Sequence, residues 1–142
     1  MSVNPSTSIQ TYHANCHCGM ITFSVRLPDL ASSKVVSCNC SICTKNGYLF
    51  VYPKCEDVIF HSGELKMTSY RFGHAKKEHK FCPTCGTSIL IDFSQADREI
   101  ERQVTAINVR TFVGAGDLIK DLDLKHVDGK TKLGPAYIEP LP

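Results

Sequence analysis

Several features that would place the sequence in a familiar class of protein are missing. It contains no tryptophan, and no stretch of about 18 consecutive apolar residues could form a membrane-spanning helix. The first ten residues, MSVNPSTSIQ, have neither a basic segment nor an apolar run. We therefore expect neither a secretory signal nor a membrane span, and we predict a cytoplasmic or nuclear protein.

An excess of charge of one sign is also missing. The 142 residues include 16 Lys and Arg against 14 Asp and Glu, a formal net charge of +2. A nucleic-acid binder usually has a strongly basic surface, so this composition does not indicate nucleic acid as the partner. We interpret the basic run over 76–80 as a solvated strand face. The motifs G-x-S-x-G, G-x-x-x-x-G-K-[ST] and G-x-G-x-x-G are absent, which leaves no nucleophile elbow, P-loop or dinucleotide fingerprint.

The sequence does contain the pattern of a small β domain. Hydrophobic residues make up 42% of the chain, and its length fits one domain. Ile21, Phe23 and Val25 alternate with polar residues, as in a half-buried strand. Further short apolar segments, separated by turn residues, are expected as strands at 34–37, 47–52, 58–60, 65–72, 88–93 and 104–112. We predict a mainly β fold of antiparallel sheets, with 1–10 as a flexible arm and 11–142 as a single domain.

Cysteine is the abundant reactive residue. The eight cysteines are Cys16, Cys18, Cys38, Cys40, Cys43, Cys55, Cys82 and Cys85, and all but Cys55 lie in three tight clusters. Disulfides need Cα atoms about 4.4–6.8 Å apart with a defined dihedral angle, which C-x-C neighbours reach only with strain. Tetrahedral zinc accepts ligands from such short loops. We therefore predict bound zinc rather than disulfides.

The first and third clusters are predicted to form one closed site. Cys16 and Cys18 are two residues apart, so on a strand their sulfurs point to the same face. Cys82-Pro-Thr-Cys85 requires a tight turn. Gly19 and Gly86 follow the two pairs and can adopt a positive φ, which lets backbone N–H groups point at sulfur. Four cysteine ligands leave no open position, so this site is expected to be structural.

The middle cluster supplies only three thiolates. Three protein ligands with one open position are typical of a catalytic zinc, and here the three are Cys38, Cys40 and Cys43. Such an ion can hold a small thiol as its fourth ligand and keep it deprotonated for attack on a carbon electrophile. Two alternatives are open at this point. Cys55 could complete a second closed site, or the three cysteines could be redox-active without a metal.

These motifs resemble the glutathione-dependent formaldehyde-activating (GFA) family, which also includes centromere protein V. The resemblance rests on Cys16-His-Cys18-Gly19, Cys38-Asn-Cys40-Ser-Ile-Cys43 with Gly47, and Phe81-Cys82-Pro-Thr-Cys85-Gly86-Thr87, and it extends to Ile107-Asn108-Val109-Arg110 and His126-Val-Asp128-Gly129. The sequence departs from the family's common pattern at two positions. Asn39 stands where members often have His, and Thr44 stands where they often have Arg.

The resemblance implies a tent-like fold of small antiparallel sheets stapled by zinc. It implies a structural zinc on Cys16, Cys18, Cys82 and Cys85, and a catalytic zinc on Cys38, Cys40 and Cys43. The implied activity is that of a carbon–sulfur lyase, which adds glutathione to formaldehyde or a similar aldehyde to give S-hydroxymethylglutathione. The expected partners are therefore a small thiol and an aldehyde. The alternative function is a non-catalytic, zinc-stabilised module that binds protein or chromatin, and it predicts that the second site is closed.

Overall fold

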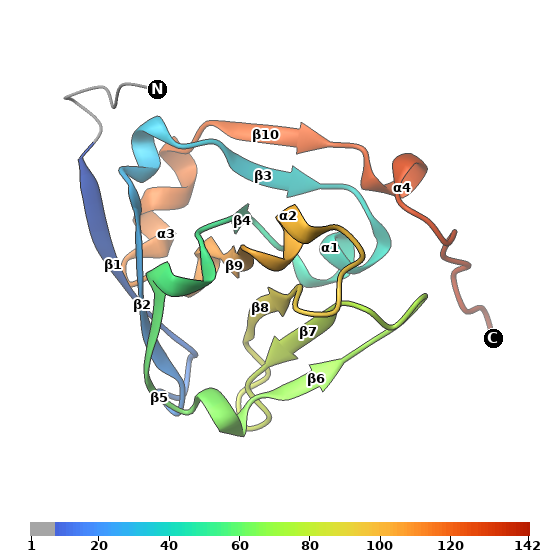
Figure 1. The fold of residues 1–142 in the computed structure, drawn as a ribbon, viewed down its shortest axis with the longest axis horizontal. Coiled ribbons are helices and arrows are strands. Elements are labelled where there is room, and N and C mark those ends of the chain that lie inside the picture. The colour runs from blue at the N-terminus through green and yellow to red at the C-terminus, as the bar shows by residue number, and fades with distance from the viewer. Residues whose placement is uncertain (1–7) are drawn as a thin grey trace.

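A three-stranded antiparallel sheet covers one side of the protein (Figure 1). The computed structural model describes residues 8–142. The sheet has the order β1-β2-β5, with β1 at Ile9–Asn15, β2 at Thr22–Pro28 and β5 at Val58–Ser62. β1 includes Ile9 and Gln10, which pair with Pro28 and Leu27, although the sequence pattern had assigned both to the N-terminal arm. Residues 1–7 of that arm lie outside the described residues.

A second sheet of seven strands forms the rest of the framework (Figure 1). Its order is β10 (Leu124–Val127), β3 (Val35–Cys38), β4 (Phe50–Val51), β9 (Thr105–Asn108), β8 (Ser88–Asp92), β7 (Glu78–Phe81) and β6 (Thr68–Tyr70). Its neighbouring strands are antiparallel except for β10 and β3, which are parallel. The predicted mainly β fold of small sheets is thus confirmed, with a parallel pair that the sequence pattern did not indicate.

The helices are short, and all but α4, which follows the last strand, lie between strands in the chain. The α-helices are α1 (Ser41–Asn46), α2 (Glu99–Arg102), α3 (Ala115–Leu118) and α4 (Gly129–Lys132). The 3₁₀ turns are η1 (Leu30–Ser32), η2 (Cys55–Asp57), η3 (Glu64–Lys66), η4 (Val109–Thr111) and η5 (Ile119–Asp121). The strand expected over 47–52 is reduced to Phe50–Val51, because α1 extends to Asn46 and its C-cap, Gly47, has a φ of 65°. Within residues 8–142, no helix has the length and apolar character needed to cross a membrane.

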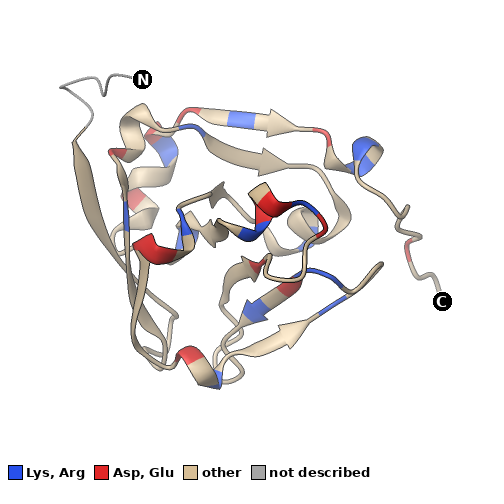
Figure 2. Ribbon diagram, in the orientation of Figure 1, with Lys and Arg blue, Asp and Glu red and all other residues tan. Residues whose placement is uncertain are grey.

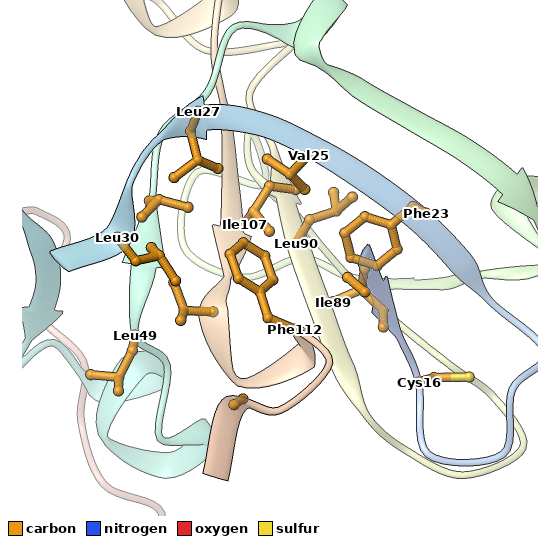
Figure 3. Packing of buried hydrophobic residues seen from close by; sticks show 14 of the residues in the cluster. Cys16, Phe23, Val25, Leu27, Leu30, Leu49, Ile89, Leu90, Ile107 and Phe112 are labelled. Carbon is orange, nitrogen blue, oxygen red and sulfur yellow. The ribbon is translucent and has the colours of Figure 1, made fainter. Parts of the chain in front are cut away.

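The main hydrophobic core lies between the two sheets. Phe23, Val25 and Leu27 of β2 point toward Ile107 and Phe112 (Figure 3), and all five are buried. The apolar residues that alternate in the sequence therefore lie on the face of β2 that packs against the core. Burying an aliphatic or aromatic side chain of this size stabilises the folded state by roughly 1.5–3 kcal/mol, so this layer holds the two sheets together.

Charged residues are concentrated outside the three-stranded sheet. Figure 2 shows Lys, Arg, Asp and Glu on the seven-stranded sheet and on the helices and turns, whereas β1, β2 and β5 carry Arg26 as their single charged residue. Several of these charges are paired across elements, such as Lys80 with Asp92 at 3.3 Å and Lys45 with Glu139 at 3.2 Å.

Candidate metal centres and the adjoining pocket

Four cysteine sulfurs meet where the β1–β2 turn faces the β7–β8 turn. The Sγ atoms of Cys16, Cys18, Cys82 and Cys85 all lie within 4.8 Å of one another. Cys16 and Cys18 are separated by 3.6 Å and Cys18 and Cys82 by 3.7 Å, sulfur to sulfur. A tetrahedral zinc with Zn–S bonds of about 2.3 Å requires sulfurs about 3.8 Å apart. The donor set and its spacing therefore fit one zinc ion with four thiolates.

Backbone N–H groups around this cluster point at its sulfur atoms. Gly19 and Gly86 both have a positive φ, 83° and 78°, as the sequence predicted. The N–H of Ile21 donates to Cys16 Sγ at 3.3 Å, and the N–H of Cys85 points at Cys82 Sγ at 3.5 Å. Donors aimed at sulfur favour the ionised thiol over the neutral one. These N–H groups therefore help to stabilise the thiolate form, which is the form that binds a cation.

The side chain of Thr87 joins the two halves of the first cluster. Its hydroxyl lies 3.2 Å from Cys85 Sγ and also accepts the backbone N–H of His17 at 3.2 Å. This hydroxyl is the main cause that lowers the pKa of Cys85 to about 5. Thr87 belongs to the β8 side and His17 to the β1 side, so the contact closes the site across 70 residues of sequence.

The second cluster stands at the end of β3 and the start of α1. Cys38 is the last residue of β3, Cys40 is the N-cap of α1, and Cys43 lies in its first turn. Their three sulfurs lie within 4.8 Å of one another, and within 8–142 no fourth Cys, His, Asp or Glu side chain joins the group. Cys55 lies elsewhere, with its Sγ 3.6 Å from the carbonyl oxygen of Arg102. Cys55 therefore does not close the second site.

The thiols of the second cluster differ in their acidity. A hydrogen bond from the Cys43 thiol, with backbone N–H groups beside it, lowers the pKa of Cys40 to about 5. The same contact, together with burial, raises the pKa of Cys43, whose side chain is 6% exposed. One sulfur of the group thus carries negative charge at neutral pH, which is the state that binds a metal ion.

Asn39 ties the second cluster to the C-terminal part of the chain. Its backbone N–H donates to the carbonyl of Val127 at 3.1 Å, and its Nδ2 donates to Asp128 Oδ1 at 3.1 Å. Its Oδ1 accepts the N–H of Lys130 at 2.9 Å. The hydrogen bond from Asn39 is also the main cause that lowers the pKa of Asp128. Thr44, the other departure from the family pattern, donates its hydroxyl to the carbonyl of Asn39 at 3.2 Å.

A pocket of about 600 Å³ opens beside the second cluster. Its lining comes from β3, α1, the segment between α1 and β4, η4 and β10, and comprises Ser37, Cys38, Asn39, Cys43, Thr44, Gly47, Tyr48, Leu49, Arg110, His126, Val127 and Asp128. A pocket of this size suits a small molecule rather than a macromolecule. The cysteine motifs predicted the cysteines of this site. They predicted no role for Arg110, His126 or Asp128, although all three lie in segments that resemble the GFA family.

Tyr48 links the pocket wall to a buried histidine. Tyr48 is 3% exposed, and its hydroxyl lies 3.3 Å from Nδ1 of His79. His79 is 4% exposed, and burial, with a smaller effect of the charge on Lys77, lowers its pKa to about 4. The interpretation of 76–80 as a solvated face is therefore wrong for His79, which points inward between solvent-facing lysines.

Comparison with known proteins agrees with this picture. The family model described as glutathione-dependent formaldehyde-activating enzyme (GFA) matches residues 11–120, a span that contains both cysteine clusters. The crystal structure of a Rhodobacter sphaeroides protein superimposes with a TM-score of 0.65 and 25% sequence identity. The match covers 81% of this chain and 99% of that one. The same arrangement of sheets is thus found in a natural protein of similar extent.

Proposed function

This chain belongs to the GFA family, and we propose that it is a zinc-dependent carbon–sulfur lyase that joins a small thiol such as glutathione to formaldehyde or a similar aldehyde. One observation carries the proposal. Three cysteine sulfurs, rather than four, are gathered within 4.8 Å, and two of the three residues line a pocket of about 600 Å³. A structural zinc site has four protein ligands and no open position, whereas a site with three protein ligands beside a cavity can accept a ligand from solution.

The donor sets fit two ions with different tasks. Cys16, Cys18, Cys82 and Cys85 would hold a structural zinc. The three sulfurs of Cys38, Cys40 and Cys43 would hold the second zinc, which would supply a position where a small thiol binds in its ionised form.

The proposed reaction is an addition without any redox change. The thiol sulfur forms a bond to the carbonyl carbon, the π electrons of the C=O bond move to oxygen, and that oxygen takes the proton that the thiol has lost. The protein's own contribution is placement. The hydrogen bonds of Asn39 fix the wall formed by Val127 and Asp128, and buried Tyr48 closes the pocket on the β7 side. Holding two reactants together in this way accelerates a bimolecular step.

The rival function, a non-catalytic binding module, has less support. It required a fourth protein ligand at the second site, for which Cys55 was the candidate, and Cys55 instead packs against Arg102 and Thr105. All eight cysteines are thiols in this fold, so we place the protein in a reducing compartment, the cytoplasm or the nucleus.

The test is an NMR measurement of hemithioacetal formation from glutathione and ¹³C-formaldehyde with zinc-loaded protein. We expect faster formation than in buffer alone. Cys40→Ser should abolish the acceleration and leave the fold intact, whereas Cys55→Ser, a matched change outside both clusters, should retain it. A rate no higher with protein than without it refutes the proposed activity, and full activity of Cys40→Ser refutes the role of the cluster.

A further inference from the structure

The pocket beside the second cluster contains a guanidinium group that no carboxylate neutralises. Arg110 lines the pocket, and within the part of the chain described, residues 8–142, it forms no ion pair. The one carboxylate in the pocket wall belongs to Asp128, and its Oδ1 already accepts hydrogen bonds from Asn39 and from the N–H of Thr131. The pocket thus presents a positive charge that is available to a ligand.

The backbone that carries Arg110 is held rigidly. Asn108, which is 3% exposed, caps the η4 turn by accepting the N–H of Arg110 on its Oδ1 at 3.2 Å. Its Nδ2 donates to the carbonyl of Ser88 at 2.9 Å. The N–H of Val109 donates to the carbonyl of Leu49 at 2.7 Å. These bonds tie the turn to β8 and to the residue just before β4, so the base of the Arg110 side chain has a fixed position.

The side chain itself is anchored by one of its donors. Nε of Arg110 donates to the carbonyl oxygen of Gly47 at 2.7 Å. Gly47 is the C-cap of α1, the helix whose first turn carries Cys43. A guanidinium has five N–H donors in a planar fork. With Nε engaged, the terminal nitrogens have no partner within 8–142, and they can meet a carboxylate with two parallel hydrogen bonds.

From this arrangement we propose that Arg110 binds a carboxylate of the thiol substrate, so that the enzyme selects thiols bearing a carboxylate over thiols that lack one. The inference rests on the proposed function, because it concerns the thiol that enters the same pocket. The volume of about 600 Å³ leaves room for a substituent well beyond the sulfur atom. A small neutral thiol would leave the guanidinium without a partner, whereas a thiol with a carboxylate arm would satisfy it.

The proposal is tested by direct binding, independently of turnover. Cobalt-substituted protein is titrated with glutathione and with glutathione diethyl ester, which keeps the thiol but has no free carboxylate, and the thiolate-to-cobalt absorption band reports occupancy. We expect glutathione to bind roughly tenfold or more tightly than the ester, as for one charge-assisted hydrogen-bonded pair. Arg110→Gln should erase this preference by weakening glutathione alone, and Arg110→Lys should retain only part of it because it lacks the fork.

Each outcome decides the question. Equal affinity of wild type for the two thiols, or an unchanged preference in Arg110→Gln, overturns the role of Arg110 while the proposed function stands. If neither thiol perturbs the cobalt band, the proposed function fails, and the inference fails with it. Arg98→Gln is the matched control, because Arg98 is exposed, pairs with Glu101 on α2 and lies outside the pocket. It should preserve the preference of the wild type.

Discussion

Gly129 lies directly against Cys38: a Cβ added to Gly129 would stand 2.4 Å from the Cys38 sulfur and 3.2 Å from the Cβ of Cys40. Contacts under 3 Å between such atoms require displacement of one of them. The start of α4 therefore packs on the second cluster so closely that only glycine fits. This relationship explains why a segment near the C-terminus is part of a site whose ligands lie some 90 positions earlier in the chain.

Gly129→Ala is expected to remove metal from the second site alone. The added methyl group would displace Cys38 and disturb the three-sulfur geometry, while the four-cysteine site would be untouched. We predict a fall from two zinc ions per chain to one, measured by inductively coupled plasma mass spectrometry, with the fold retained. Gly116→Ala is the control, because a Cβ there meets nothing within 4 Å. Two tightly held ions in Gly129→Ala would contradict this account of the packing.

Loss of the first site should be far more damaging than loss of the second. The four sulfurs join the β1–β2 and β7–β8 turns, and a structural zinc of this kind contributes about 10 kcal/mol or more to folding at neutral pH. Cys82→Ser is therefore expected to yield unfolded or aggregated protein, whereas Cys40→Ser and Cys55→Ser remain folded. Circular dichroism during thermal unfolding measures the difference. A cooperative transition in Cys82→Ser at the wild-type temperature would contradict a structural role for this site.

Asn39→Ala should loosen α4. The amide of Asn39 both donates to Asp128 and accepts the N–H of Lys130, so its removal leaves Lys130 without its partner. Each such hydrogen bond contributes about 1 kcal/mol. We expect faster hydrogen exchange at the Lys130 amide, read by NMR, and more rapid loss of zinc from the second site to a chelator. Gln103→Ala, a change at an exposed residue, is the control. Unchanged exchange at Lys130 would show that α4 is held by other contacts.

The buried His79 should make the fold sensitive to acid. Burial lowers the pKa of His79 to about 4, whereas in the unfolded chain the value is about 6.5. The unfolded state therefore binds more protons in this range, and stability is lost progressively as the pH falls from 6.5 to 4, by up to roughly 3 kcal/mol. An NMR titration of the His79 imidazole checks this directly. A midpoint near 6.5 would contradict its burial in the native state.

The cysteine pattern predicted how the sulfurs gather, because each motif is local. The two cysteines of each motif lie close together, and the glycines after Cys18 and Cys85 adopt the predicted positive φ. The alternation of Phe23 and Val25 predicted the core face of β2 for the same reason. The expectation that Cys16 and Cys18 share a strand face was wrong, because β1 ends at Asn15 and both cysteines lie in the β1–β2 turn. That these donors bind zinc stays a prediction.

The pocket wall could not be predicted, because it depends on pairings between distant segments. The parallel pairing of β10 with β3 places Val127 opposite Cys38, and no local pattern in either strand encodes that register. Arg110 is held at the pocket by contacts with Asn108 and with Gly47, which lies 63 positions earlier in the chain. His79 was misassigned because the lysines around it dominate the local composition, although strand alternation could have indicated an inward position.

The central claim is that one metal ion is enclosed by four cysteines while another, held by three, accepts a thiol from solution. Anomalous scattering at the zinc edge from crystals of the zinc-loaded protein soaked in glutathione tests it most directly. We predict one peak among Cys16, Cys18, Cys82 and Cys85, and a second peak bound by Cys38, Cys40, Cys43 and the glutathione sulfur. A second site without metal, or one whose fourth ligand is a protein side chain, would contradict the account.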